Sequence, residues 1–198
     1  MTTWLISDLH LGHSFVAGLR GFPDVGDHDA AVMASLGCVT PEDVLWVLGD
    51  VTCTGDRTKM SRALTMLMTH PARKHLVAGN HDPVHPMHAE AHKWIPFYHP
   101  AFLSVQPFAR LKIAGTDAGI RRKSLLLSHF PYQYGGDSHD EDRYGQYRFP
   151  DLGLPLVHGH THQPERLSRG PGGGLQINVC WEAWQRPVKL DEIVELIG

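Results

Sequence analysis

Residues 44–50 read VLWVLGD, a continuous run of apolar residues that ends in a glycine and an aspartate. An apolar run bounded by glycine is typical of a strand that is buried on both faces of a sheet. The same pattern, an apolar run followed by a small residue and then by an acid, an asparagine or a histidine, recurs along the chain. The other runs are residues 4–8 (WLISD), 75–81 (HLVAGNH), 125–129 (LLLSH) and 154–160 (LPLVHGH). The sequence therefore predicts buried strands whose carboxyl ends carry polar side chains.

Helical patterns lie between some of the expected strands. Residues 57–69 place their apolar side chains on one stripe at a spacing of about 3.6 residues. Asp27 is expected to cap a helix that runs through Leu36, and residues 191–197 are expected to form a short terminal helix. Strands that alternate with helices predict an α/β fold. Residues 102–128 show the pattern of consecutive strands, so the later part of the sheet structure should be more antiparallel.

The composition is that of an ordinary globular protein. We expect one domain, residues 1–198.

The 18 lysines and arginines and the 21 aspartates and glutamates give a net charge of −3, which does not favour a nucleic-acid or anionic membrane surface. Three scattered cysteines disfavour a disulfide framework or a thiolate zinc site and suit a reducing compartment. No signal peptide and no apolar run of about 18 residues is found, so we expect a cytoplasmic protein with no membrane partner.

The polar strand ends form the candidate site. Ligands of open α/β sheets bind outside the carboxyl ends of the strands, so these side chains should meet at one edge. Asp8 and His10 are two residues apart, a spacing that points both side chains the same way in extended backbone, and His160 and His162 repeat it. The set of seven oxygen and nitrogen donors is too large for one tetrahedral ion and suits two ions that share a carboxylate. Its members are Asp8, His10, Asp50, Asn80, His129, His160 and His162. We expect Mn²⁺, with Fe, Ni, Zn or Co as alternatives.

Five sequence blocks resemble, in order, the motif set of the calcineurin-like metallophosphoesterases. They are DLH (8–10), GD (49–50), GNHD (79–82), SH (128–129) and GHTH (159–162). The resemblance implies the compact four-layer α/β/β/α sandwich of that family, with two mixed sheets flanked by helices. It also implies two divalent metal ions. One would be held by Asp8, His10, Asp50 and His162, and the other by Asp50, Asn80, His129 and His160.

The resemblance gives catalytic roles to Asp50 and His81. Asp50 would bridge the two ions, and His81 would face the scissile phosphate without binding metal. Two ions about 3.5–4 Å apart can lower the pKa of a bound water toward about 7. A histidine near its reference pKa of about 6.5 can protonate a leaving alkoxide. Asp82 either orients the ring of His81 or is an ordinary loop acid, and the sequence leaves both roles open.

The expected reaction is hydrolysis of a phosphodiester. Protein phosphatases of this superfamily carry Asp-Arg shortly after Gly-Asp, whereas this sequence continues Gly49-Asp50-Val51-Thr52. The missing arginine disfavours a dianionic monoester, and His81 favours a diester whose alkoxide needs a proton. The first candidate substrates are 2′,3′- or 3′,5′-cyclic nucleotides and other small diesters. The alternatives are a nuclease acting on DNA or RNA, a phosphomonoesterase, and a non-catalytic scaffold of the same fold.

Residues 131–150 follow a predicted ligand and are rich in tyrosine, as in a loop that closes over a nucleotide. Tyr132 is expected to stack on a base and Arg148 to meet a phosphate, with an ordinary packed loop as the alternative. His13, three residues after His10, is expected to reach the substrate or to lie behind the ligands. Four further histidines are expected to be exposed on the surface: His85, His88, His92 and His99.

Overall fold

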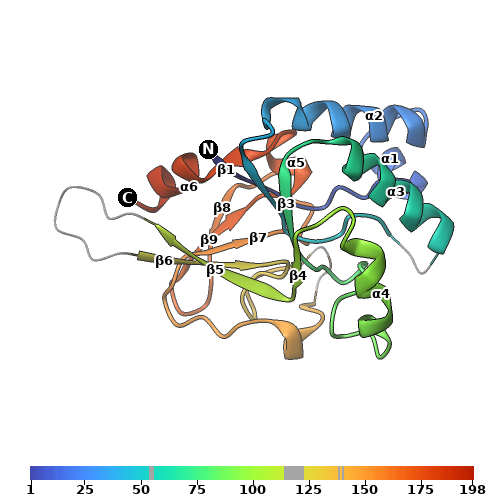
Figure 1. Cartoon of the computed structure of the whole chain (residues 1–198). Helices are drawn as coiled ribbons and strands as arrows, with labels where there is room; N and C mark the ends of the chain where they lie inside the picture. Colours follow the sequence, from blue (N-terminus) through green and yellow to red (C-terminus); the bar gives the residue numbers. More distant parts are fainter. Residues whose placement is uncertain (54–55, 114–122, 138, 140) are drawn as a thin grey trace.

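The computed structural model describes residues 1–53, 56–113, 123–137, 139 and 141–198, and its strands form two sheets (Figure 1). The first sheet contains β1 (Thr3–Ile6), β2 (Val44–Val47), β3 (Arg73–Val77), β4 (Ser104–Gln106) and β10 (Val188–Lys189). In it, β1 to β4 are parallel neighbours and β10 lies antiparallel beside β1. The strands expected from the apolar runs near the N-terminus therefore form one mainly parallel sheet.

The second sheet is built from the later part of the chain. It contains β5 (Phe108–Ile113), β6 (Lys123–Ser128), β7 (Leu156–His158), β8 (Leu167–Arg169) and β9 (Leu175–Asn178). The order is β5-β6-β7-β9-β8, with parallel central strands and an antiparallel strand at each edge. The consecutive strands predicted over residues 102–128 correspond to β4, β5 and β6, and residues 114–122 lie outside the described part.

Helices cover the first sheet on the face turned away from the second sheet (Figure 1). The helices on this side are α1 (Ser14–Leu19), α2 (Val25–Ser35), α3 (Arg57–Thr69), α4 (Ala91–Tyr98) and α5 (Trp181–Trp184), with the 3₁₀-helix η1 (Leu36–Cys38). The last helix, α6 (Leu190–Ile197), and the 3₁₀-helix η2 (Gly145–Tyr147) lie elsewhere. The helix predicted over residues 57–69 is α3. The two mixed sheets with flanking helices confirm the predicted fold class.

Strand residues of the first sheet alternate between two hydrophobic cores. In β2, Leu45 and Val47 pack with side chains of α2 and α3. Trp46 and the following Leu48 point to the other face and pack with the second sheet. Both faces of this strand are therefore buried, as its continuous apolar run predicts.

The helix that was expected to begin at Asp27 begins one turn earlier. The Asp24 side chain accepts hydrogen bonds from the backbone amides of Gly26 and Asp27, at 2.6 and 2.9 Å, and so caps α2. The prediction was wrong because the apolar spacing starts only at Ala30, whereas the first turn of the helix is polar. A polar first turn is compatible with a helix once an N-cap satisfies its free amides.

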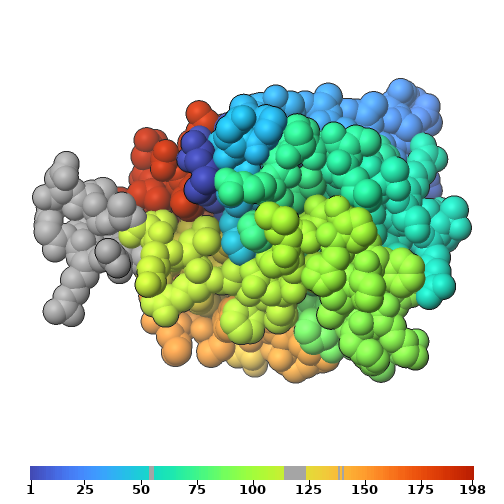
Figure 2. All heavy atoms as spheres, viewed as in Figure 1, coloured from blue at the N-terminus to red at the C-terminus, as the bar shows by residue number. Residues whose placement is uncertain are grey.

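Residues of the described segments 129–137 and 141–152, which include η2, lie against the second sheet. The backbone amide of Tyr132 donates to the Gln176 side chain of β9 at 2.8 Å, and that side chain donates to the carbonyl of Gly135 at 3.0 Å. At one end of the sandwich, α6 packs beside the N-terminal strand (Figure 2), with Ile193 buried in the core between the sheets. No helix in the described part of the chain is long and apolar enough to cross a membrane.

Candidate metal centre

The polar side chains predicted at the strand ends converge where the two sheets end together. In the first sheet, Asp8 follows β1, Asp50 follows β2 and Asn80 follows β3. In the second sheet, His129 follows β6 and His160 follows β7. All of these side chains are buried. Parallel neighbouring strands place their carboxyl ends at the same edge, which explains why residues so far apart in sequence meet here.

The first ligand group consists of Asp8, His10 and His162. The Oδ1 atom of Asp8 lies 3.4 Å from Nε2 of His162 and 3.7 Å from Nε2 of His10. The two Nε2 atoms are 3.1 Å apart. Three donor atoms thus face one point, in the manner of ligands around a single cation.

The second group consists of Asp50, Asn80 and His129. The Nε2 atom of His129 lies 2.9 Å from Oδ1 of Asn80 and 3.5 Å from Oδ2 of Asp50. The same Asp50 oxygen lies 3.7 Å from Nε2 of His10, so it stands between the two groups. Gly79 is required next to it, because a Cβ at this position would overlap the Asp50 carboxylate. Asp50 is thus the side chain placed to contact two ions at once.

The charge and hydrogen bonding of these residues fit divalent cations. Oδ1 of Asp8 is buried and has no hydrogen-bond partner among the described residues. Burial, reinforced by the negative charge of Asp8, holds the pKa of Asp50 well above its ordinary value. Burial alone would also raise the pKa of Asp8, but contact with His10 and the charge of His162 outweigh it and lower that pKa. Two adjacent buried carboxylates with few cationic partners are the environment that a bound cation would stabilise.

Glu182 fixes the ring of His162. Its Oε1 atom lies 2.7 Å from Nδ1 of His162, which leaves Nε2 to face Asp8. Arg20 holds the same oxygen through Nε at 2.9 Å and Nη2 at 2.7 Å. A carboxylate behind a metal-binding histidine sets its tautomer and raises its basicity. The role of Glu182 was not predicted, because a single acid in a short tryptophan-rich segment carries no local signal.

Asp137 plays the same part for His160. Its Oδ2 atom lies 3.0 Å from Nε2 of His160, so the other ring nitrogen, Nδ1, is the one left to bind a cation. The backbone amide of His160 donates to Oδ2 of Asp8 at 3.0 Å, and its ring lies 5.2 Å from that of His129. Asp137 was also missed, because nothing in its sequence context distinguishes it from the other acids of its loop.

The backbone is left-handed at five of the predicted ligands. The φ angles are +59° at Asp8, +47° at His10, +54° at Asp50, +72° at His160 and +52° at His162. This conformation costs a non-glycine residue about 1–3 kcal/mol and concentrates at functional sites. The prediction that the two paired spacings are extended is therefore wrong. The side chains converge because the chain turns sharply at each strand end.

A cleft of about 690 Å³ opens beside the first ligand group, and His81 and His13 line it. The exposed ring of His81 lies 5.6 Å from that of His10, and its backbone amide donates to Asp50 at 2.9 Å. The ring of His13 lies 5.5 Å from that of His10. Both histidines are therefore placed at the entrance to the ligands, and their predicted roles toward substrate remain predictions.

Asp82 does not orient His81. Its buried carboxylate accepts hydrogen bonds from the amides of Asp50 at 2.9 Å, Val51 at 3.1 Å and Gly79 at 2.8 Å. Burial, together with the charge of Asp50, raises the pKa of Asp82 to about 7. Of the two roles left open by the sequence, the structural one applies, because Asp82 ties together the two loops that carry ligands.

The predictions that Tyr132 and Arg148 contact the substrate are corrected by the structure. Tyr132 is 1% exposed, and its hydroxyl donates to the carbonyl of Leu154 at 2.7 Å. The buried guanidinium of Arg148 pairs with Asp137 and with Asp142. Arg148 thus holds the 131–150 loop together from within, and Tyr132 ties this loop to the segment that leads into β7. This is the packed-loop alternative.

Two of the four histidines expected on the surface are also placed differently. His85 is buried against Phe130, with ring centroids 5.7 Å apart. Nε2 of the half-buried His88 lies 3.0 Å from the carbonyl oxygen of Asn80, beside the ligands. His92 and His99 are exposed as expected.

Comparisons with known proteins identify relatives of this chain in sequence and in fold. The sequence profile of the family described as calcineurin-like phosphoesterase matches residues 1–164. The chain is 41% identical to the gene 66 protein of Mycobacterium phage L5 over 199 residues, covering 99% of this chain and 94% of that protein. It is 39% identical to the gene 66 protein of Mycobacterium phage D29 over 198 residues, covering 98% and 95%. A protein of unknown function from Aquifex aeolicus has the same fold, with a TM-score of 0.67, 24% identity and 98% of each chain covered.

Proposed function

The chain belongs to the calcineurin-like phosphoesterase family and is a metal-dependent phosphoesterase, and we propose that its substrates are phosphodiesters, with 2′,3′- or 3′,5′-cyclic nucleotides as first candidates. The observation that carries the metal chemistry is the position of Asp50. Its Oδ2 atom lies 3.7 Å from His10 and 3.5 Å from His129, between the two ligand groups. We propose Mn²⁺ as the bound metal, with Fe, Ni, Zn or Co as alternatives.

Different residues of the chain would bind the ions, orient the ligands and transfer a proton. Two divalent ions in this site would supply an activated water and neutralise charge on the phosphate oxygens. Asp50 would bind both ions and so hold them next to each other. Glu182 would keep the ring of His162 oriented toward the ion that His162 binds. We propose that His81, at the cleft entrance, donates an imidazole proton to the oxygen of the leaving alkoxide. Burial lowers the pKa of His81 to about 4, and the negative charge of a bound diester would raise that pKa toward the value this role needs.

The lining of the cleft supports a diester over a monoester. Both arginines that line it, Arg20 and Arg143, are engaged by carboxylates. A dianionic monoester is favoured by a bidentate guanidinium that is available to it, and the described lining offers none outside these pairs. Phe15 and Leu19 of α1 also line the cleft, and both present exposed apolar surface. This surface suits the organic group of an ester.

The test is a substrate panel on protein stripped of metal and reloaded with Mn²⁺. The panel contains both classes of cyclic nucleotide, bis(p-nitrophenyl) phosphate and p-nitrophenyl phosphate, with Asp50→Ala as the inactive reference. We expect kcat/KM to be higher for the diesters, and a higher value for the monoester would refute the proposal. Single-stranded DNA and RNA form a further arm. Preferred cleavage that falls steeply with salt would instead identify a nuclease.

A further inference from the structure

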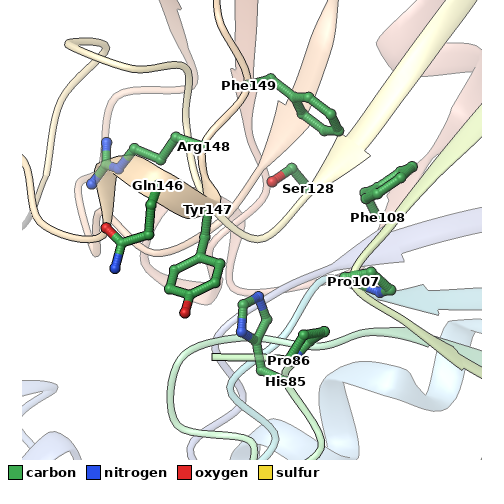
Figure 3. Close-up of a pocket in the computed structure, with 9 residues that line it drawn as sticks. All are labelled: His85, Pro86, Pro107, Phe108, Ser128, Gln146, Tyr147, Arg148 and Phe149. Atoms are coloured by element: carbon green, nitrogen blue, oxygen red, sulfur yellow. The ribbon is translucent and has the colours of Figure 1, made fainter. Parts of the chain in front are cut away.

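A second pocket lies beside the metal centre and shares no described lining residue with the catalytic cleft. It has a volume of about 290 Å³ (Figure 3). It is formed by the loop after β3 that carries His85 and Pro86, the turn between β4 and β5, the end of β6 and the segment around η2. Ser128, which lines it, immediately precedes the predicted ligand His129. The pocket is therefore built on the same strand end that supplies the metal centre.

Aromatic rings form the walls of this pocket. His85 and Tyr147 meet edge-to-face with centroids 5.4 Å apart, and Phe108 and Phe149 do so at 5.2 Å. Figure 3 shows these two pairs on opposite sides of the space, with Ser128 between them. Phe108 is 53% exposed and Tyr147 37% exposed, so both present ring surface that no other side chain covers. Walls of this kind accept a flat ring by stacking or edge contact.

Two buried side chains of the pocket, Ser128 and His85, each offer a hydrogen-bond donor. Oγ of Ser128 accepts from the amide of Phe130 at 3.1 Å, so its hydroxyl hydrogen remains to be donated. Nδ1 of His85 accepts from the amide of Met87 at 3.1 Å, and burial lowers the pKa of His85 to about 4. The neutral ring therefore carries its hydrogen on Nε2. Ser128 and His85 are each 3% exposed, and neither hydrogen finds an acceptor in the part of the chain that the structure describes.

The pocket offers no free charge. Its one charged lining residue is Arg148, whose guanidinium is paired with Asp137 and Asp142. Figure 3 shows this guanidinium turned away from Ser128 and Phe149. A phosphate would therefore find no cation here, and the ligand group that fits is uncharged.

We propose that this pocket binds a nucleobase. A base is flat, aromatic and uncharged, and its edge carries ring nitrogens and carbonyl oxygens that accept hydrogen bonds from Ser128 and His85. A plain hydrocarbon ring would leave both buried donors without partners, which is costly. The link to catalysis rests on the proposed function, because the base would then belong to a nucleotide substrate or product. Phe130 connects the two sites, since its ring lies 5.7 Å from that of His85 and 5.0 Å from that of His129.

The first experiment measures binding of adenosine to the Mn²⁺-loaded protein by calorimetry. Phe108→Ala removes an exposed stacking surface, and Leu152→Ala, at an exposed apolar position outside both cavities, is the matched control. Loss of one base–aromatic contact should weaken adenosine binding about 5- to 150-fold in the Phe108 variant. The control should bind as wild type does. Absence of adenosine binding, or equal affinity in the wild type and Phe108→Ala, overturns the proposal.

A second variant tests the donors. Ser128→Ala should weaken adenosine binding and leave the affinity for toluene, which has no acceptor, unchanged. Equal losses for both ligands would contradict base recognition.

Competition then identifies the source of the base. If adenosine raises the KM for hydrolysis of a cyclic nucleotide, the pocket binds the base of the substrate. If adenosine binds without raising this KM, the pocket binds a separate nucleoside. Either result supports a base-binding pocket. Adenosine binding without any phosphodiester hydrolysis refutes the proposed function alone. Hydrolysis without adenosine binding refutes the pocket alone.

Discussion

Glu182 should control the affinity of one metal ion without touching it. Its carboxylate holds Nδ1 of His162 at 2.7 Å and is itself held by two nitrogens of Arg20. Glu182→Gln keeps an oxygen that can accept the hydrogen bond but removes the charge, and Glu182→Ala removes both. Either change makes the ring of His162 a weaker ligand and leaves the positive charge of Arg20 uncompensated beside the ion.

The size of the effect follows from the position of Glu182 behind the ligand. Loss of a carboxylate that orients a metal-binding histidine costs about 10- to 100-fold in metal affinity, which corresponds to about 1.4–2.8 kcal/mol. We expect the loss of metal affinity in Glu182→Gln to be near the lower value, because its hydrogen bond to His162 survives. The loss in Glu182→Ala should be near the upper value. The ion bound by Asn80 and His129 should keep its affinity, because neither residue contacts Glu182.

The assay is a calorimetric titration of the metal-free protein with Mn²⁺, with bound metal counted by mass spectrometry. Glu192→Gln is the matched control, because Glu192 also pairs with an arginine, Arg186, at 3.0 and 2.7 Å but lies outside the site. Thermal unfolding of each variant shows whether the fold is kept. Wild-type affinity for both ions in Glu182→Ala would refute the reasoning, and so would an equal loss in the Glu192→Gln control.

Three further predictions concern other parts of the chain. Asp137→Asn should weaken the ion bound through His160 about tenfold or more while the ion at Asp8 keeps its affinity; a Mn²⁺ titration in which both ions weaken equally would contradict this. His81→Ala should retain both ions but lower kcat about 10²-fold on an alkyl diester. The loss in kcat should be much smaller on bis(p-nitrophenyl) phosphate, because its leaving group needs no proton. Equal losses in kcat on the two substrates would exclude a general acid. Backbone hydrogen bonds hold the pKa of Asp43 below its usual range. The Asp43 carboxylate should therefore stabilise the fold at every pH above the unfolded pKa of about 3.9. This stabilisation should be lost as the pH falls through the lower pKa of the folded state. Urea unfolding should show Asp43→Asn to be less stable than wild type at pH 7 and nearly equal to it at strongly acidic pH, and a gap that does not change with pH would argue against this.

The strands and the metal-ligand types could be predicted because both are encoded locally. The apolar run before Asp50 predicts a strand buried on both faces, and β2 is such a strand. The apolar stripe over residues 57–69 predicts a helix there, and α3 spans the same residues. A strand end followed by a polar residue also predicts where a site will form, because parallel strands must end at a common edge.

The details of the site could not be predicted, because they depend on how the loops fold and on contacts that only the folded chain brings about. Whether Arg148 faces substrate or protein is decided by Asp137 and Asp142, which the folded loop brings to it. The convergence of Asp8 and His10 depends on a left-handed backbone, whose strain only the surrounding packing can maintain.

The sequence by itself determined the fold class, the strand ends and the identity of the candidate ligands, because hydrophobic periodicity and motif spacing act over a few neighbouring residues. Only the tertiary structure decided which carboxylates stand behind the histidines and which aromatic side chains remain uncovered. Glu182 is 20 residues from His162, and Asp137 is 23 residues from His160. Pairs at such separations meet only after the sheets have packed, so no local pattern records them.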